Sequence, residues 1–296
     1  MATTSGATTL GTLAECVPTI VASALLALDE GNIVQPLVTD VPFSGPGSVH
    51  STPIISRVVA SETDDPTYQT MDSDGGTWPT EEASPSNATV AVHSAYILLK
   101  DIAALSSVGD MAAVAGQLIG QSIVVRRDLD LVTLFTSFTT NQGTTTTVAI
   151  APADLYDAYG SLRRYFAPLP YELVLHPMQI WASKGLVELF DNSSDAIQSQ
   201  GVGTVGEDFA RYGFAGMVMG FRLWSDANIP RTTTAGSGAA FSREAIKNVR
   251  KRDFQIEIQR SAVAVADAIV GSEIRGEAMV RDGHGNEMQF VSWIAV

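Results

Sequence analysis

One long uninterrupted segment constrains the fold of this chain more than any other feature. Residues 107–138 read SVGDMAAVAGQLIGQSIVVRRDLDLVTLFTSF and contain no proline. Small or apolar residues recur in steps of four and three, which is the spacing of one helical face. They are Met111, Ala115, Leu118, Ser122, Val125, Leu129 and Val132. We therefore predict a helix of roughly 40 Å, at 1.5 Å per residue, that serves as the spine of a plate-like subunit. An ordinary long core helix is the simpler alternative.

Two glycines inside this segment indicate close packing. Gly116 and Gly120 each cost a helix about 1 kcal/mol relative to alanine. A helix that keeps both is expected to have another backbone packed against it. Asp110 is positioned to cap the first turn, and the helix is expected to end at the turn residues 141–143.

Composition and charge exclude several classes of protein. The chain has 296 residues, with 32 acidic and 18 basic side chains and a formal charge of −14. This charge argues against tight general binding to nucleic acid, which needs Lys and Arg. The single cysteine, Cys16, permits no intrachain disulfide and is consistent with a reducing cytoplasm. The apolar residues 17–28 have no base before them and are too few to span a bilayer, so we expect no membrane association.

The region between Pro42 and Pro85 is rich in proline and unusually acidic. Between residues 61 and 82 it contains no base and these acids: Glu62, Asp64, Asp65, Asp72, Asp74, Glu81 and Glu82. Strands are predicted on either side, at 54–60 and 89–99. Two strands flanking a long polar excursion predict a projecting β-arm. Disorder is the alternative, but the anchoring residues Tyr68, Met71 and Trp78 argue against it.

The remaining elements are predicted from periodicity, caps and turn residues. Helices are expected at 13–28, 152–166, 178–190 and 243–252, with a short Ala/Val helix after residue 260. Strands are expected at 144–150, 171–175 and 254–258, in short pieces within 202–224, and at 273–280 paired with 287–293 across the turn 282–286. A glycine-rich loop is expected at 235–240. The alternation of strands and helices makes the central block α/β.

The sequence shows no convincing catalytic or metal site. The glycine pattern at 201–206 fits GxGxxG, but a polar segment precedes it where a dinucleotide fold needs a hydrophobic strand. His50, His93, His176 and His284 lie far apart, and one cysteine gives no zinc spacing. His176 is the best candidate for a site, although a hydrogen-bonded turn histidine is the favoured interpretation. The run 191–195 lacks the Gly and Glu of a calcium loop. We expect no cofactor, no metal and no enzyme, with an acidic enzyme using 201–206 as the remote alternative.

Basic residues cluster in two places and oppose the acidic arm in sign. These bases are either solvated helix faces or contacts for the arm of another copy. Under the second interpretation, the predicted subunit-interface residues are Glu62, Asp64, Asp65, Trp78, Glu81, Glu82, Arg126, Arg127, Arg243, Lys247, Arg250, Lys251 and Arg252.

Several stretches, in this order, resemble the major capsid proteins of tailed bacteriophages, which have the Hong Kong 97-like shell fold. An acidic arm containing GGTWPTEE precedes a strand and the long helix. YELVLHPMQIWASKGLVELF resembles the core of the family's axial domain, as does GFAGMVMGFRLWSDANIP. The closing segment, with FSREAI, FQIEIQ and a final hairpin, resembles the family's return to its peripheral domain. The resemblance covers residues 33–293.

The resemblance implies an α+β fold with the following parts. They are an N-terminal arm (1–36), an extended β-loop with flanking strands (37–100), a peripheral domain with the spine helix (101–150), an α/β axial domain (151–240) and a C-terminal return to both domains (241–296). It also implies self-assembly into hexamers and pentamers of an icosahedral virion capsid that encloses double-stranded DNA. Assembly would take place in the bacterial cytoplasm, with portal, scaffolding and decoration or cement proteins as partners and only non-specific contact with DNA.

This chain differs from some members of the family in one feature. In those members, the extended loop is crosslinked through a lysine and an asparagine of neighbouring subunits. The lysines here are Lys100, Lys184, Lys247 and Lys251, so none lies within the loop. We therefore expect a shell that is stabilised noncovalently. An encapsulin-like compartment with enzyme cargo shares the fold and remains the alternative.

Overall fold

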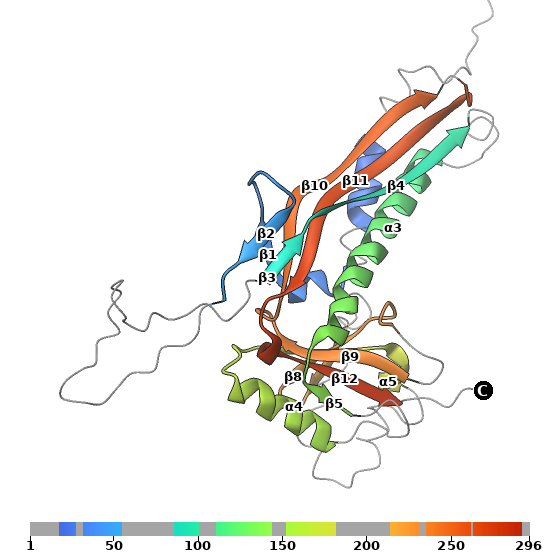
Figure 1. The fold of residues 1–296 in the computed structure, drawn as a ribbon. Helices are drawn as coiled ribbons and strands as arrows, with labels where there is room; N and C mark the ends of the chain where they lie inside the picture. The colour runs from blue at the N-terminus through green and yellow to red at the C-terminus, as the bar shows by residue number, and fades with distance from the viewer. Residues whose placement is uncertain are drawn as a thin grey trace, which may run out of the picture.

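The computed structural model describes residues 18–27, 32–54, 86–100, 111–143, 152–181, 214–230, 235–261 and 263–291. These residues form an elongated α+β molecule, with one sheet and a long helix at one end and a second sheet at the other (Figure 1). The predicted strand 144–150, the acid run 191–195 and the glycine pattern 201–206 lie outside the described residues, as does all but one residue of the predicted strand 54–60.

The first sheet has four strands in the order β1-β10-β11-β4. Its centre is a long antiparallel ribbon of β10 (Ile246–Ser261) and β11 (Ala266–Met279). β4 (Ala91–Lys100) pairs antiparallel with β11, and β1 (Thr39–Pro42) pairs parallel with β10. One face of this sheet packs on the long helix, which runs alongside it (Figure 1).

The long helix is confirmed as α3 (Met111–Thr133), which continues into the 3-10 helix η2 (Leu134–Ser137). Its predicted apolar face is right only in part, because Ala115 and Val132 are buried but other members of that face are exposed. Ile119 and Ile123 are buried, whereas Leu118 is 52% exposed and Val125 is 44% exposed. The helix has apolar residues on more than one side, so periodicity alone did not orient it. The sheet packs on the side that carries Ile119.

The glycines of α3 confirm the predicted close approach of another backbone. Residues 18–27 are helical and pack across α3. A Cβ atom added at Gly116 would lie 2.4 Å from the carbonyl oxygen of Ile20, and one at Gly120 would lie 2.5 Å from that of Ala24. The hydroxyl of Ser23 also donates a hydrogen bond of 3.0 Å to the carbonyl of Ala113. Glycine is therefore what lets the two helices touch.

The second sheet has six strands in the order β5-β12-β9-β6-β8-β7. Their bounds are β5 (Asn141–Gln142), β6 (Tyr171–Leu175), β7 (Phe214–Val218), β8 (Phe221–Ser225), β9 (Ala235–Ser242) and β12 (Gly285–Val291). Helix α4 (Pro152–Arg164) covers one face, and the short helix α5 (Pro177–Trp181) follows β6. Leu155 and Leu162 of α4 pack with Tyr171, Phe221 and Met288 of the sheet, all of them fully buried.

A two-stranded sheet forms the base of the segment that contains the acidic region. β2 (Val49–Thr52) pairs antiparallel with β3 (Ser86–Thr89), so residues 53–85 leave and return at one place. Neither strand is one of those predicted: the predicted strand 89–99 corresponds to β4, and the predicted strand 54–60 lies outside the described residues except for residue 54. The 3-10 helix η1 (Gln35–Leu37) precedes β1.

Two predicted elements near the C-terminus are wrong because burial hides their periodicity. The predicted helix 243–252 is instead a turn at 243–245 followed by the first part of β10. Residues 246–249 are buried on both faces of the sheet, so they lack the alternation that marks a half-exposed strand. The predicted glycine-rich loop 235–240 is strand β9. A Cβ at Gly238 would lie 2.4 Å from the carbonyl oxygen of Val174, so this glycine permits close pairing rather than a turn.

The predicted Ala/Val helix and final hairpin are also wrong. Residues 263–265 form a turn and β11 follows at once. β11 pairs with β10 and β4, whereas β12 pairs with β9 and β5. The turn before β12, which contains the 3-10 helix η4 (Asp282–His284), therefore carries the chain from the first sheet to the second.

A buried ionic network fastens α3 to the first sheet. Arg275 on β11 is 4% exposed in its side chain and forms ion pairs with Glu273 at 2.7 Å, Asp130 at 3.3 Å and Glu277. Arg127 on α3 also pairs with Glu273. Asp130 also belongs to α3, so the network ties one turn of the helix to the strand beneath it.

Candidate subunit-interface surface

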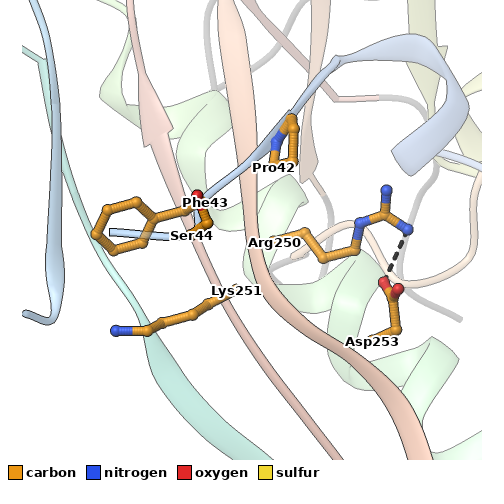
Figure 2. Close-up of a pocket in the computed structure, with 6 residues that line it drawn as sticks. All are labelled: Pro42, Phe43, Ser44, Arg250, Lys251 and Asp253. Atoms are coloured by element: carbon orange, nitrogen blue, oxygen red, sulfur yellow. Dashed lines mark ion pairs between the residues drawn. The ribbon is translucent and has the colours of Figure 1, made fainter. Parts of the chain in front are cut away.

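The middle of β10 carries an open basic pocket beside β1. β10 and β11 shift register between Arg250 and Arg252 and again before Gln255, so the strand bulges here. The pocket has a volume of about 200 Å³ and is lined by Pro42, Phe43, Ser44, Arg250, Lys251 and Asp253 (Figure 2). Phe43 is held in place because its backbone N–H donates to the carbonyl of Arg250 at 2.9 Å.

The two basic residues of this pocket have different interaction partners. Arg250 forms ion pairs with Asp40 at 3.1 Å and Asp253 at 2.8 Å, and its side chain stays 45% exposed. Lys251 donates to the carbonyl of Gly47, and its ammonium lies 5.0 Å from the centre of the Phe43 ring. An aromatic ring beside accessible bases suits a segment that carries both carboxylates and apolar side chains.

Lys247 does not belong to this surface, which corrects its assignment to the interface. It is 1% exposed and lies under the β2-β3 sheet. Its ammonium donates to the carbonyl of Ser86 at 2.6 Å, the hydroxyl of Thr52 at 2.7 Å and the carbonyl of His50 at 3.4 Å. Burial lowers the pKa of Lys247 to about 8. The residue therefore anchors both strands at the base of the segment 53–85.

The other basic residues predicted for the interface differ in how far their side chains are exposed to solvent. Arg127 is committed to Glu273 within the chain, with its side chain 14% exposed. Arg252 is half-buried and donates to the hydroxyl of Ser272 at 2.8 Å. Arg126 is 59% exposed and pairs with Asp130 at 3.0 Å, and the exposed Arg243 donates to the carbonyl of Val38 at 3.2 Å. Arg126, Arg243, Arg250 and Lys251 thus remain accessible to another molecule.

The acidic half of the predicted interface lies outside the described residues: Glu62, Asp64, Asp65, Trp78, Glu81 and Glu82. Three residues that were not predicted from the sequence line the pocket or pair with its arginine, namely Asp40, Phe43 and Asp253. Phe43 had a detectable signal, because it is an aromatic residue between prolines 42 and 46, where a solvated loop rarely keeps one. Asp40 had none, because its partner Arg250 is distant in sequence.

Within the described residues, the histidine singled out as a candidate site has a structural role. His176 is buried at the end of β6, and its Nδ1 accepts a hydrogen bond of 3.1 Å from the backbone N–H of Met178, as expected for a turn histidine. The described residues contain no group of three or more His, Cys, Asp or Glu placed to hold a metal ion. Among the described helices, none combines the length and the apolar character needed to cross a bilayer.

Sequence comparison and structural comparison give different results. No protein-family model and no curated protein sequence matches this chain. Solved structures do match over most of its length. A capsid chain of Ralstonia phage GP4 matches with a TM-score of 0.61 and 13% identity, covering 88% of this chain and 88% of that chain. A capsid chain of cyanophage P-SCSP1u matches with a TM-score of 0.59 and 16% identity, covering 85% and 86%.

An encapsulin is similar to the same degree. A chain of the holo-SrpI encapsulin complex from Synechococcus elongatus PCC 7942 matches with a TM-score of 0.58 and 11% identity, covering 93% of this chain and 90% of that chain. These identities are too low to transfer residue roles, but the coverage extends to both sheets and the long helix. The chain therefore has the fold of tailed-phage capsid proteins, as the resemblance in its sequence predicted.

Proposed function

We propose that this chain is the major capsid protein of a tailed bacteriophage, which self-assembles into the icosahedral shell around the double-stranded DNA genome. The observation that carries the proposal is structural similarity to phage capsid chains over most of both chains, 85% and 86% for the cyanophage chain and 88% and 88% for the GP4 chain. The elongated shape supports it, because an elongated subunit offers long edges to its neighbours (Figure 1). The role is structural, with no catalytic step.

The setting and partners follow from that proposal. Subunits form hexamers and pentamers in the bacterial cytoplasm and remain in the virion capsid. Portal, scaffolding and decoration or cement proteins complete the particle. The net charge of −14 weakens the binding of packaged DNA to the shell, so the DNA contacts the shell only non-specifically.

We propose that the acidic segment 62–82 of one subunit lies on the basic surface of its neighbour. The accessible bases of this chain are Arg250 and Lys251 in the pocket, Arg243 before β10 and Arg126 on α3. The support is opposite charge together with the aromatic face of Phe43, against which Trp78 or an apolar residue of the segment packs. Exposed ion pairs of this kind are worth up to about 1 kcal/mol each, so they set register more than affinity.

Electron microscopy of the expressed chain tests the shell proposal. At rising protein concentration, we expect hexameric rings or closed particles of uniform diameter. The same preparations should be repeated with the candidate scaffolding protein from the same genome, if the chain alone gives rings only. A protein that stays monomeric in light scattering under both conditions contradicts the proposal.

Neutralising the pocket tests the interface. We expect the double variant Arg250→Gln and Lys251→Gln to raise the critical concentration for assembly about tenfold, which corresponds to about 1.4 kcal/mol lost per association step. Light scattering against protein concentration measures this. The control is Arg163→Gln and Arg164→Gln, which removes the same charge from the exposed end of α4. Equal losses in both variants indicate a general effect of net charge and contradict the specific contact.

An encapsulin-like compartment is the second candidate, favoured by the encapsulin match. Its test is the content of purified particles. Empty or DNA-filled shells support the capsid assignment. A single enzyme that copurifies in fixed ratio with the shell supports the compartment.

A further inference from the structure

One histidine lies where the edge strand of the first sheet meets the long helix. His93 is on β4, its side chain is 12% exposed, and its Nδ1 lies 3.6 Å from Oδ2 of Asp130 on α3. In the strand register it is directly opposite Glu273 of β11. Among the described strands, β4 pairs only with β11. The contact with α3 is therefore the second attachment of this strand, and His93 lies in it.

The ionic network beside His93 has equal numbers of positive and negative groups. They are joined by ion pairs and consist of Arg126, Arg127, Arg275, Asp130, Glu273 and Glu277. The centre of the network is buried, because the side chain of Arg275 is 4% exposed and that of Glu273 is 3% exposed. Water and salt screen a charge in such a place only weakly. A protonated His93 would be a fourth cation with no carboxylate of its own.

The carboxylate oxygen that faces His93 has no acceptor position left for it. Oδ2 of Asp130 accepts from Nε of Arg126 at 3.1 Å and from Nη2 of Arg275 at 3.3 Å. A carboxylate oxygen has about two lone-pair sites, so both are in use. At 3.6 Å, the imidazole nitrogen is too far from this oxygen for a hydrogen bond. A proton on the ring therefore gains no hydrogen bond there and adds a charge beside two guanidinium groups.

The electrostatics of the site agree with this geometry. Burial lowers the pKa of His93 below its ordinary value of 6.5, and the charges of Arg275 and Arg126 act in the same direction. The charges of Asp130 and Glu273 act in the opposite direction without reversing the shift. The imidazole of the folded subunit therefore stays neutral at a pH where a free histidine is already protonated.

We propose that His93 is an acid-sensitive joint, which holds β4 against α3 while the imidazole is neutral and loosens this contact when the ring takes up a proton. β4 follows directly on β3, the strand at the base of the segment 53–85. The joint thus lets pH act on the strand through which that segment returns to the first sheet. This inference concerns the subunit itself and stands whether or not the chain builds a shell.

The direction of the pH dependence follows from the lowered pKa of His93. The unfolded chain binds this proton near pH 6.5, whereas the folded chain binds it only at lower pH. The joint therefore contributes stability that is fully present above pH 6.5 and is lost as the pH falls through the pKa of the folded state.

Other buried groups also titrate in acid. Burial raises the pKa of Asp128, Asp226 and Glu277, so these carboxyl groups favour the folded state as the pH falls and oppose the joint. All three remain in every variant below. The difference between the native chain and a variant of His93 therefore isolates the histidine.

Amide hydrogen exchange of the full chain, measured by mass spectrometry, tests the joint. The informative peptides cover β4, after correction for the intrinsic pH dependence of exchange. In the native chain, we expect their protection to fall about fivefold between pH 7 and pH 5.5, within the limit of about tenfold per pH unit that uptake of one proton sets. In His93→Gln, which carries no charge at any pH, this fall should disappear. His50→Gln removes a histidine from β2 instead and should keep the native fall.

A second variant tests the crowded oxygen of Asp130. Arg126→Ala removes one of its two donors at a position where the side chain is 59% exposed. A protonated His93 can then donate to the vacated site, so we expect its pKa to rise and the fall in protection to shrink. Exchange of the histidine C2 hydrogen, followed peptide by peptide, measures this pKa in free subunits and in particles alike. A general loss of stability would lower protection at every pH without raising the pKa.

Three outcomes overturn the joint. One is an equal fall in protection in His93→Gln and in the native chain. Another is a pKa of His93 at or above 6.5 in the native chain, since the fold would then favour the protonated ring. The third is an unchanged pKa in Arg126→Ala, because crowding at Oδ2 of Asp130 would then have no effect. None of these results bears on whether particles form, so failure here is separate from failure of the shell proposal.

Discussion

Replacing Arg275 with alanine is expected to lower the free energy of unfolding by about 3–5 kcal/mol, the cost of breaking a buried ion pair by removing one partner. The guanidinium is 4% exposed and contacts Glu273, Glu277 and Asp130. Burial already raises the pKa of Glu277, and Arg275 is the group that opposes this rise. Without the arginine, Arg127 remains as a partner for Glu273, while Glu277 loses its ion pair.

Denaturant unfolding of the full chain measures this loss, with the slope of the transition checked for two-state behaviour. The control is Arg126→Ala, which removes a 59% exposed arginine that pairs with the same Asp130 at 3.0 Å. An exposed pair four residues apart on a helix is worth about 0.3–0.5 kcal/mol. Comparable losses in the two variants would show that burial of the network contributes nothing.

Alanine at Gly276 is expected to destabilise the subunit by about 2–3 kcal/mol, the upper part of the range for overpacking. Its Cβ would lie 2.2 Å from the carbonyl oxygen of Thr89 and 2.7 Å from the carbonyl carbon. These are backbone atoms at the point where β3 leads into β4, so no side-chain rotation relieves the clash. The strand that returns from the acidic segment would have to move off β11.

The matched substitution is Gly160→Ala in α4, where an added Cβ meets nothing within 4 Å. Alanine is favoured over glycine in a helix by about 1 kcal/mol, so this variant should be more stable than the native chain. The two changes are chemically identical and are expected to have opposite signs. Thermal unfolding of both variants measures the difference in stability. Loss of stability at both positions would contradict the packing argument.

Elements with one buried face could be predicted from the sequence. The long helix, α4 with its proline start and β4 were all expected near their observed bounds, as was the fully buried β6. β9 and the start of β10 were not, because their contacts come from distant segments. Gly238 looks like a loop residue until Val174 is beside it, and residues 246–249 look helical until both faces of the sheet cover them.

The candidate interface was predictable in charge but not in exposure. The sequence shows that Lys247, Arg250 and Lys251 are basic, but not that Lys247 is buried under β2 and β3 while its neighbours reach solvent. Likewise, Asp128 looked like one more charged position on a helix. Its buried side chain accepts a hydrogen bond from the backbone N–H of Val34, which lies 94 residues earlier in the chain.

The order in which the strands enter the two sheets has a consequence during synthesis. Asp40 of β1 touches Asn248 of β10 across 208 residues, and the first sheet has no centre until β10 and β11 have left the ribosome. Contacts this distant in sequence form late and slowly. A growing chain therefore cannot complete the first sheet until translation is nearly over, so β1 and β4 stay without their partner strands for most of synthesis.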